Sequence, residues 1–323
     1  MKVLVLTTSY PPHGGSFVAA SVEAARLAGF EVEVVSPSSF RHFGIAGGHG
    51  IVGNLRARPW LALLVPLFLW NMRRAAARVE CDLVHAHWLV CGVVAATLRK
   101  PYVVQPWGTD VALLGRLPWR FPRVIAASRF LAEQMGGAQI VPTPVPIPDH
   151  VGEPEAICLF AGRLSPEKGI AEFVAATDGL PRIVVGAGPV DVPESVGEVS
   201  DVGPYYERAA VVVVPSRREG YGMVAREAMA YGRAVVATDV GGLRDAIEDG
   251  IDGLLVPPRD VAALRAAVER LLGDGELRAL LGATARTKAE REWSTAAAAD
   301  AVLGVYRSSV DMGRSGRRPR RAR

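Results

Sequence analysis

The sequence predicts an α/β protein made of two doubly wound halves. Short apolar runs alternate with amphipathic stretches over residues 1–141, and the same alternation starts again after residue 154. Uninterrupted runs of valine, isoleucine and leucine are typical of parallel strands covered by helices on both faces. Five prolines in residues 142–154 separate the two series, because proline can continue neither a helix nor a central strand.

Each half contains five expected strands, and 323 residues with 50% hydrophobic content suffice for two buried cores. In the first half, strands are expected over 2–7, 31–35, 82–85, 102–105 and 124–127, and helices over 17–28, 60–79 and 90–98. In the second half, strands are expected over 157–161, 182–185, 210–214, 234–237 and 254–256, and helices near 167–178, 223–231, 242–248 and 260–272. This alternation predicts a Rossmann-like fold for each half.

We therefore expect an N-terminal domain over residues 1–147 and a C-terminal domain over residues 148–292. The proline-rich segment between them reads as a stiff linker that acts as a hinge. A last amphipathic stretch over 293–310 precedes a basic tail, 311–323, which we expect to be disordered.

The distribution of charge argues against a nucleic-acid partner. Residues 1–150 carry 14 basic and 8 acidic side chains, whereas residues 151–312 carry 17 and 25. Six arginines without an acid lie in residues 313–323 and produce the net charge of +4. A basic half followed by an acidic half is not a continuous surface for a phosphate backbone.

The cysteines and the apolar runs favour a cytoplasmic protein. Cys81, Cys91 and Cys158 form neither a CxxC pair nor a metal-ligand cluster, which suits a reducing compartment. The start of the chain lacks the pattern of a signal peptide. No apolar run reaches the ~18 residues of a membrane span, and the longest, Trp60–Trp70, is interrupted by Pro66. We interpret this run as a buried core helix.

The clearest chemistry lies in residues 215–222, directly after a run of four valines. In an open α/β sheet, ligands bind in loops that leave the carboxyl ends of strands. Gly220 and Gly222 let the backbone approach a ligand, and the helix that follows offers free N–H groups to an anion such as a diphosphate. Glu219 and Glu227 suit a ligand with hydroxyls on both sides of its phosphates. Taken alone, this spacing favours an ordinary acidic helix start.

A second candidate segment, residues 160–169, leaves another expected strand. Arg163 and Lys168 bracket a Ser-Pro helix start in it. Arginine offers a rigid fork of donors and lysine a point charge, so together they can neutralise most of a diphosphate leaving group. Solvated surface charges are the alternative interpretation.

In combination, these motifs closely resemble the GT4 family of retaining glycosyltransferases, which have the GT-B fold. The resemblance rests on Gly162-Arg163, Glu167-Lys168-Gly169, Glu219-Gly220-Tyr221-Gly222, Glu227-Ala228-Met229-Ala230, Gly232, Val235-Val236-Ala237-Thr238, Gly241-Gly242 and Gly253-Leu254-Leu255-Val256. Weaker features are Tyr10-Pro11-Pro12, Gly14-Gly15, Asp82-Leu83-Val84-His85-Ala86-His87, Gly108-Thr109-Asp110, Trp293 and Val305-Tyr306. The resemblance implies two Rossmann-like domains that face a central cleft, with a C-terminal helix that crosses back to the N-terminal domain.

The resemblance also implies an enzyme. It transfers a sugar from an NDP-sugar, with UDP or GDP, to an acceptor hydroxyl with retention at the anomeric carbon, and it uses no metal and no cofactor. The acceptor is then a small molecule or a lipid-linked glycan, in polysaccharide, glycolipid or glycoconjugate biosynthesis. Alternatives are an NDP-sugar epimerase on the same scaffold and a non-catalytic NDP-sugar-binding protein. A phosphorylase would need a pyridoxal phosphate lysine, and none is evident.

By resemblance, the site residues divide into three groups. The catalytic residues are His87, Glu219, Lys168 and Arg163. The donor-binding residues are Gly14, Gly15, Arg163, Lys168, Glu219, Gly220, Tyr221, Gly222, Met223, Val224 and Glu227. In the family, the positions of Arg163 and Lys168 contact the diphosphate, that of Glu227 binds ribose, and that of Glu219 binds sugar hydroxyls. The position of His87 lies by the anomeric carbon, and Asp110 is an acceptor-side residue.

Two of the departures of the chain from the family pattern affect the expected site. Many members carry histidine where this chain has Trp107, directly before Gly108-Thr109-Asp110. Residues 182–216, which should contain the loop that reads the nucleotide base, are compressed. The base is therefore not predicted.

Basic residues also predict a peripheral contact with the inner face of an anionic membrane. Arginines lie on both sides of the apolar run, at positions 56, 58, 73, 74 and 78, and six more lie in the tail. Each basic residue near an anionic surface contributes about 1 kcal/mol of binding energy. A lipid-linked acceptor would suit that location.

Overall fold

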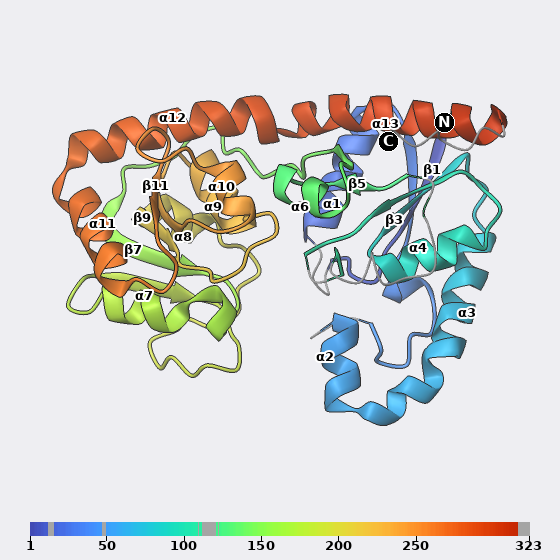
Figure 1. Ribbon diagram of the computed structural model, residues 1–323, viewed down its shortest axis with the longest axis horizontal. Helices are drawn as coiled ribbons and strands as arrows, with labels where there is room; N and C mark the ends of the chain where they lie inside the picture. Colours follow the sequence, from blue (N-terminus) through green and yellow to red (C-terminus); the bar gives the residue numbers. More distant parts are fainter. Residues whose placement is uncertain (12–15, 47–49, 109, 112–120, 122, 316–323) are drawn as a thin grey trace. The chain divides into compact units, whose positions relative to one another are not determined.

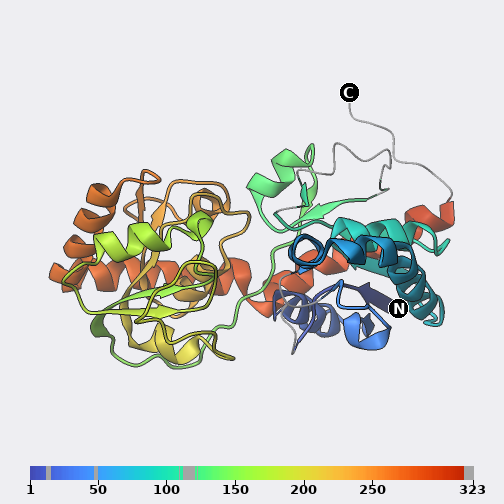
Figure 2. The same ribbon diagram turned by 90° about the horizontal axis from the view of Figure 1, so that it is seen from below.

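The computed structural model describes residues 1–11, 16–46, 50–108, 110–111, 121 and 123–315. It divides into two compact units (Figures 1 and 2). Unit 1 comprises Met1–Pro144 and the chain from Thr295 onward, and unit 2 comprises Val145–Ser294. Both units are built on parallel sheets with helices on both faces, so the predicted fold class is confirmed.

Unit 1 is built on a four-stranded parallel sheet. The strands are β1 (Lys2–Leu6), β2 (Glu31–Val35), β3 (Leu83–His87) and β4 (Tyr102–Gln105). Their order is β2-β1-β3-β4. A short pair, β5 (Ile125–Ala126) and β6 (Gln139–Ile140), follows. The chain leaves β1 toward β2 and returns on the other side to β3, so the carboxyl edge between β1 and β3 is a topological switch point, where ligands bind in such sheets.

Helices cover both faces of this sheet. They are α1 (Ser16–Leu27), η1 (Pro37–Ser39), α2 (Gly50–Ala57), η2 (Pro59–Leu64), α3 (Val65–Ala77), α4 (Leu89–Ala96), α6 (Arg129–Gln134) and α13 (Thr295–Ser315). On one face, α3 and α4 pack against Leu4 and Leu6. On the other, α1 and α13 pack against Val3 and Leu83, and the Tyr306 hydroxyl lies 2.7 Å from His85 Nδ1. The C-terminal helix thus returns to unit 1, as the fold class predicts.

Unit 2 contains a five-stranded parallel sheet in the order β11-β10-β9-β7-β8. The strands are β7 (Glu155–Ala161), β8 (Arg182–Val185), β9 (Ala209–Val214), β10 (Ala234–Thr238) and β11 (Leu254–Val256). The chain passes from β7 to β8 and then back to β9 on the other side of β7. The edge between β7 and β9 is therefore the switch point of this sheet.

The helices of unit 2 bury the two faces of its sheet in separate cores. They are η3 (Pro166–Lys168), α7 (Ile170–Ala176), α8 (Gly203–Arg208), α9 (Met223–Ala230), α10 (Gly242–Ala246), α11 (Val261–Gly273) and α12 (Gly275–Trp293). Phe173 of α7 and Leu264 of α11 fill one core, whereas Met229 of α9 and Trp293 of α12 fill the other.

The structure differs from the sequence prediction in several details. The division between units falls after Pro144 and after Ser294, not after residues 147 and 292. Helix α13 continues to Ser315, so residues 311–315, expected in a disordered tail, are helical. The single helix expected over 60–79 is a 3-10 segment followed by α3, because Pro66 occupies the first turn of α3.

Candidate active site

Lys168 and Glu219 meet at the switch point of unit 2. Lys168 follows β7 and Glu219 follows β9, and these strands are parallel neighbours. Lys168 Nζ lies 2.6 Å from Glu219 Oε2, and the Ser216 hydroxyl donates to the same oxygen at 3.4 Å. The Glu219 side chain is 15% exposed and that of Lys168 36%, so both remain accessible to a ligand. The structure therefore brings these two predicted site residues together.

Two glycines of the sequence motifs allow the loops to come this close. A Cβ on Gly169, which adopts a positive φ of 71°, would lie 2.0 Å from the backbone oxygen of Pro215. A Cβ on Gly242 would lie 2.2 Å from the oxygen of Gly220. Both distances are far below van der Waals contact, so any side chain there would push the loops apart. Their close packing fixes the backbone of Glu219, whose oxygen accepts a hydrogen bond from the Gly242 N–H at 2.9 Å.

Glu227 lies one turn inside α9 and is largely shielded from solvent. The Tyr206 hydroxyl of α8 donates to its Oε2 at 2.8 Å. Burial raises the pKa of Glu227 to about 7, and the hydrogen bond from Tyr206 opposes that rise. The carboxyl group is therefore half ionised near neutral pH. Charge on it is stabilised only if further donors, such as ligand hydroxyls, reach it.

The remaining predicted residues lie in the loop between β9 and α9, residues 215–222, which we call the donor loop, and at the start of α9. Gly222 adopts a positive φ of 83° directly before the helix, and Met223 and Val224 are the first helical residues. The N–H groups at the start of a helix have no partner within it and favour an anion. Tyr221 is buried, and the guanidinium of Arg226 packs over its ring at 4.0 Å. This packing makes the loop a fixed part of unit 2.

Arg163 does not take part in the Lys168–Glu219 ion pair. It is on the same loop, but its side chain is exposed and, within the described part of the chain, makes no hydrogen bond or ion pair. Backbone contacts hold that loop, since the Leu164 N–H donates to the oxygen of Ala187 at 3.0 Å.

In unit 1, His87 ends β3 at the switch point and is fully buried. Trp107 Nε1 donates to His87 Nδ1 at 3.3 Å, and the two rings stack at an interplanar angle of 11°. Burial lowers the pKa of His87 well below its usual range, and the neighbouring His85 lowers it further. Because an indole N–H only donates, Nδ1 accepts and the imidazole proton lies on Nε2. Within the described residues, this Nε2–H has no partner.

Asp110 connects the loop after β4 to the start of α4. One carboxylate oxygen accepts from the Leu89 N–H at 2.8 Å, and the other accepts from the Trp107 N–H. Burial raises the pKa of Asp110 to about 6, against the effect of these two hydrogen bonds. Asp110 therefore positions Trp107, the partner of His87. The predicted residues Gly14 and Gly15 lie outside the described residues.

Three residues of these sites were not predicted from the sequence. Trp107 stood out only as a departure from the family pattern, yet it fixes the proton of His87. Tyr206 lies in the compressed segment and shows no sequence signal. Ser216 precedes Glu219 by three residues in a loop that the sequence analysis had already identified, so it could have been predicted as a partner of Glu219.

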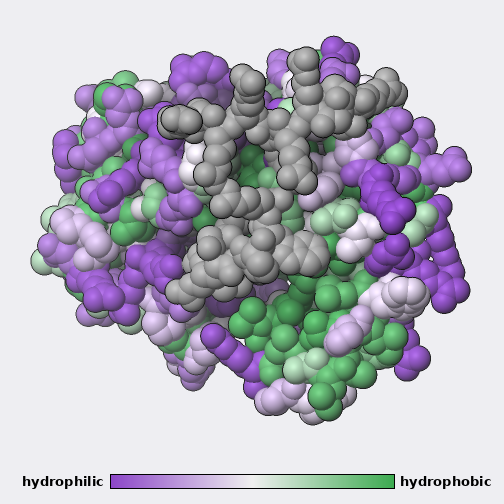
Figure 3. Space-filling model, turned by 45° about the vertical axis from the view of Figure 1, so that its right-hand side comes forward, coloured by the Kyte–Doolittle hydropathy of each residue, from purple (hydrophilic) through white to green (hydrophobic). Residues whose placement is uncertain are grey.

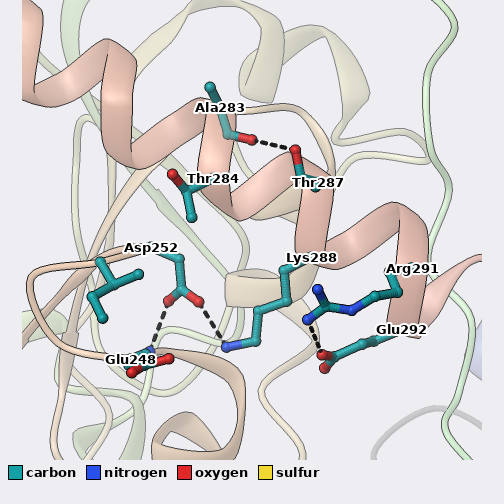
Figure 4. A pocket seen from close by; sticks show the side chains of 9 residues that line it. Glu248, Asp252, Ala283, Thr284, Thr287, Lys288, Arg291 and Glu292 are labelled. Carbon is teal, nitrogen blue, oxygen red and sulfur yellow. Dashed lines mark hydrogen bonds and ion pairs between the residues drawn. The ribbon is translucent and has the colours of Figure 1, made fainter.

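A separate polar pocket of about 570 Å³ lies on unit 2 between α12 and the turn before β11 (Figure 4). Lys288 Nζ pairs with the buried Asp252 at 2.7 Å, and Asp252 also accepts from the Glu248 N–H at 2.7 Å. These contacts close the turn itself. Because the turn enters β11, the pocket is at the amino edge of the sheet, opposite the Lys168–Glu219 pair.

Within the described residues, no group of three or more His, Cys, Asp or Glu side chains is arranged to hold a metal ion. None of the helices described is long and apolar enough to span a bilayer.

Two parallel-sheet units, each with polar residues at its switch point, define the class of GT-B proteins, and solved structures agree. Sucrose-phosphate synthase from Thermosynechococcus elongatus matches with a TM-score of 0.78 and 22% identity over 95% of this chain and 98% of that one. Anabaena Alr3699/HepE, solved with UDP-glucose, matches with a TM-score of 0.75 and 19% identity over 95% of this chain and all of that one. At these identities the likeness establishes the fold.

The family follows from sequence profiles. Residues 15–147 match Glycosyltransferase Family 4 and residues 155–274 match Glycosyl transferases group 1. Together the two matches cover most of the chain, which therefore belongs to the GT4, group 1, glycosyltransferase family. The predicted family is confirmed.

Several relatives carry the names of sugar transferases. The α-D-kanosaminyltransferase of Streptomyces kanamyceticus is 34% identical over 174 residues, 47% of this chain and 45% of that protein. The lipopolysaccharide core biosynthesis mannosyltransferase LpcC of Rhizobium leguminosarum bv. viciae is 34% identical over 169 residues, 52% of this chain and 46% of that protein. The matched region spans just under half the length of each relative. These names do not favour an epimerase.

Proposed function

We propose that this chain is a retaining glycosyltransferase that moves a sugar from an NDP-sugar, with UDP or GDP, to an acceptor hydroxyl. The observation that carries the proposal is the Lys168–Glu219 pair at the switch point between β7 and β9. Glu227 lies eight residues after Glu219 in the sequence, one turn inside α9. The HepE structure with UDP-glucose lends support, because that GT-B protein binds a nucleotide sugar.

We assign each polar group to one part of the donor. Lys168 and the N–H groups at the start of α9 face the diphosphate, and the exposed Arg163 side chain is free to join them. Glu219 accepts from hydroxyls of the sugar, and Glu227 accepts from the ribose hydroxyls. In the absence of donor, the ion pair keeps the Lys168 and Glu219 side chains at this edge of the sheet. Less side-chain conformational entropy is therefore lost when the donor binds.

The proposed reaction needs no enzyme nucleophile. The bond between the anomeric carbon and the diphosphate oxygen breaks, and a bond from the acceptor oxygen forms on the same face. The acceptor proton passes to the departing diphosphate oxygen, whose charge Lys168 stabilises. We assign His87 to the anomeric carbon, where positive charge develops. Its lowered pKa keeps the imidazole neutral, so the ring does not repel that charge, whereas an imidazolium would. Asp110 acts on the acceptor side by accepting the hydrogen bond from the Trp107 N–H, which positions Trp107.

The proposed acceptor is a small molecule or a lipid-linked glycan used to build polysaccharide, glycolipid or glycoconjugate. We further propose a cytoplasmic protein that contacts the inner face of an anionic membrane. The excess of basic residues in the first 150 positions supports this contact, as do the six arginines of residues 313–323.

Incubation with radiolabelled UDP- and GDP-sugars, with and without a membrane extract, tests the proposal. Incorporation of label that depends on an acceptor is expected, and the anomeric proton coupling in the NMR spectrum of the product should match that of the donor. An inverted anomer would refute retention. Isomerised donor without transfer would indicate an epimerase, and donor binding without turnover would indicate a binding protein.

A further inference from the structure

Unit 1 exposes a group of large apolar side chains on α2, η2 and α3. We call it the apolar ridge, and its members are Val52, Trp60, Leu63, Leu67 and Trp70. Their exposed fractions range from 45% for Leu67 to 84% for Leu63. Figure 3 shows hydrophobic residues gathered on this part of the surface. Each of the other large apolar side chains exposed in the described residues comes from a different segment of the chain, so the ridge is a distinct feature.

The ridge is the outer face of elements that are well anchored inside. Leu61 of η2 and Phe68 and Met72 of α3 are at most 1% exposed and fill the core beneath the sheet. The interpretation of Trp60–Trp70 as a core helix is therefore correct for one face and wrong for the other. Because the inner face already completes the core, folding of unit 1 does not explain why the outer face is apolar.

The charge around the ridge has one sign. Residues 34–79 contain six arginines and no aspartate or glutamate. Arg56, Arg58, Arg74 and Arg78 are exposed, and within the described residues their guanidinium groups make no hydrogen bond or ion pair. An apolar face edged by unpaired arginines is complementary to the acyl boundary of a bilayer with anionic headgroups.

A lipid surface fits the ridge better than a second copy of this chain does. In a two-fold dimer the same face meets itself, so these arginines would lie against arginines. Tryptophan is also enriched at the interface of membranes, where an amphipathic ring sits at the level of the headgroups. The ridge has one tryptophan at each end of its Trp60–Trp70 segment.

We infer that the apolar ridge is a docking surface that enters the interfacial layer of an anionic lipid bilayer, with its arginines on the headgroups. The inference rests on the proposed membrane contact and names the surface that makes it. Trp60 and Leu63 supply apolar burial, and Arg56 and Arg58 supply attraction to anionic lipid. The contact then has an apolar part that resists salt, in contrast to binding through the arginines of residues 313–323 alone.

Sedimentation with vesicles tests the inference. The full chain is mixed with vesicles of phosphatidylcholine that contain about one third phosphatidylglycerol, and with phosphatidylcholine alone. The double variant Trp60→Ser/Leu63→Ser is expected to lower the partition coefficient at least tenfold, since full burial of one such side chain is worth roughly 1.5–3 kcal/mol. Arg56→Gln/Arg58→Gln should lower it more than tenfold at low salt, at about fivefold for each charge removed.

Leu27→Ser is the matched control, because Leu27 is 62% exposed on α1 and lies outside the ridge. It should sediment as the unchanged protein does. Deletion of residues 313–323 separates the two contacts: the shortened chain should still bind, and fluorescence of Trp60 and Trp70 should be quenched by brominated lipids.

Three outcomes would overturn the inference. If the unchanged chain stays in the supernatant with anionic vesicles, both the membrane contact and the ridge are wrong. If it sediments but the ridge variants sediment equally, the membrane contact survives and the ridge is wrong. If Leu63→Ser abolishes a concentration-dependent dimer instead, the ridge is a protein interface. Donor binding measured on the same variants should not change. A failure of the glycosyltransferase proposal, which donor binding and transfer test, is therefore distinguishable from a failure of the ridge.

Discussion

Replacing Glu227 by glutamine is expected to remove a pH dependence from donor binding. Glu227 has a pKa of about 7 because it is buried, so it is about 90% ionised at pH 8 and about 10% ionised at pH 6. If only the carboxylate binds the ribose hydroxyls well, the apparent Kd rises as the ionised fraction falls, by roughly tenfold from pH 8 to pH 6. The affinity is therefore present above the pKa and is lost as the pH falls through it.

The folded protein without donor should show the opposite trend in stability. The pKa of Glu227 is raised from 4.5 in the unfolded chain to about 7, so the folded state favours the neutral carboxyl. Its contribution to the free energy of unfolding is complete below pH 4.5 and declines as the pH rises through 7. Donor binding should offset that decline, because the ligand's hydroxyls stabilise the charge.

Isothermal titration calorimetry with UDP-glucose and GDP-mannose at several pH values measures this directly. The diphosphate of a nucleotide sugar does not titrate between pH 6 and 8. Titration of the ligand therefore does not contribute to the dependence of the apparent Kd on pH. Glutamine keeps an acceptor for the Tyr206 hydroxyl, and Glu227→Gln should bind about tenfold more weakly at pH 8, with no dependence on pH. The same slope in both proteins, or no slope in the unchanged protein, would refute the assignment.

Substitutions at Lys168, Trp107 and Gly242, two of them with a comparison variant, test the remaining parts of the site. Lys168→Ala removes the cation beside the leaving group, so kcat should fall on the order of 10²-fold, with Lys168→Arg in between. Trp107→Phe keeps the stacked ring but removes the N–H that fixes the His87 proton, so kcat should fall about tenfold at unchanged donor KM, and nitrogen NMR shifts of His87 should show a mixture of tautomers. Gly242→Ala places a methyl group 2.2 Å from a donor-loop oxygen and should weaken donor binding at least tenfold, whereas Gly273→Ala, with open space around it, should not.

Each of these predictions has its own contrary result. Full activity of Lys168→Ala, with the fold intact by circular dichroism, would exclude a role for this lysine in leaving-group stabilisation. A single unchanged tautomer in Trp107→Phe would show that other contacts hold the His87 proton. Equal donor affinity in Gly242→Ala and Gly273→Ala would mean that the position of the donor loop does not control binding.

The sheets and the donor loop were predictable from the sequence for one physical reason. Buried parallel strands must be continuously apolar, so runs such as residues 209–214 stand out, and the polar residue that follows each run lies at the carboxyl edge. Lys168 and Glu219 were found in this way, and the structure joins them in an ion pair. Lys168 and Glu219 could be predicted because each lies only a few residues after the end of its strand.

The sequence failed where a property depends on contacts between distant segments. Tyr206 reaches Glu227 from another helix, so nothing local to either residue predicts the hydrogen bond or the raised pKa. Helix α12 was not predicted, although Asp274 caps its first turn by accepting a hydrogen bond from the Leu277 N–H. The apolar ridge was taken as core because hydropathy reports composition, and only packing shows which face is covered.

The central claim is that a nucleotide sugar binds at the switch point of unit 2, and a crystal structure after soaking with a panel of UDP- and GDP-sugars tests it most directly. We expect the diphosphate within hydrogen-bond distance of Lys168 Nζ and the N–H groups that begin α9, with ribose hydroxyls on Glu227 and sugar hydroxyls on Glu219. A nucleotide bound elsewhere, for example in the pocket beside Lys288, would contradict the claim.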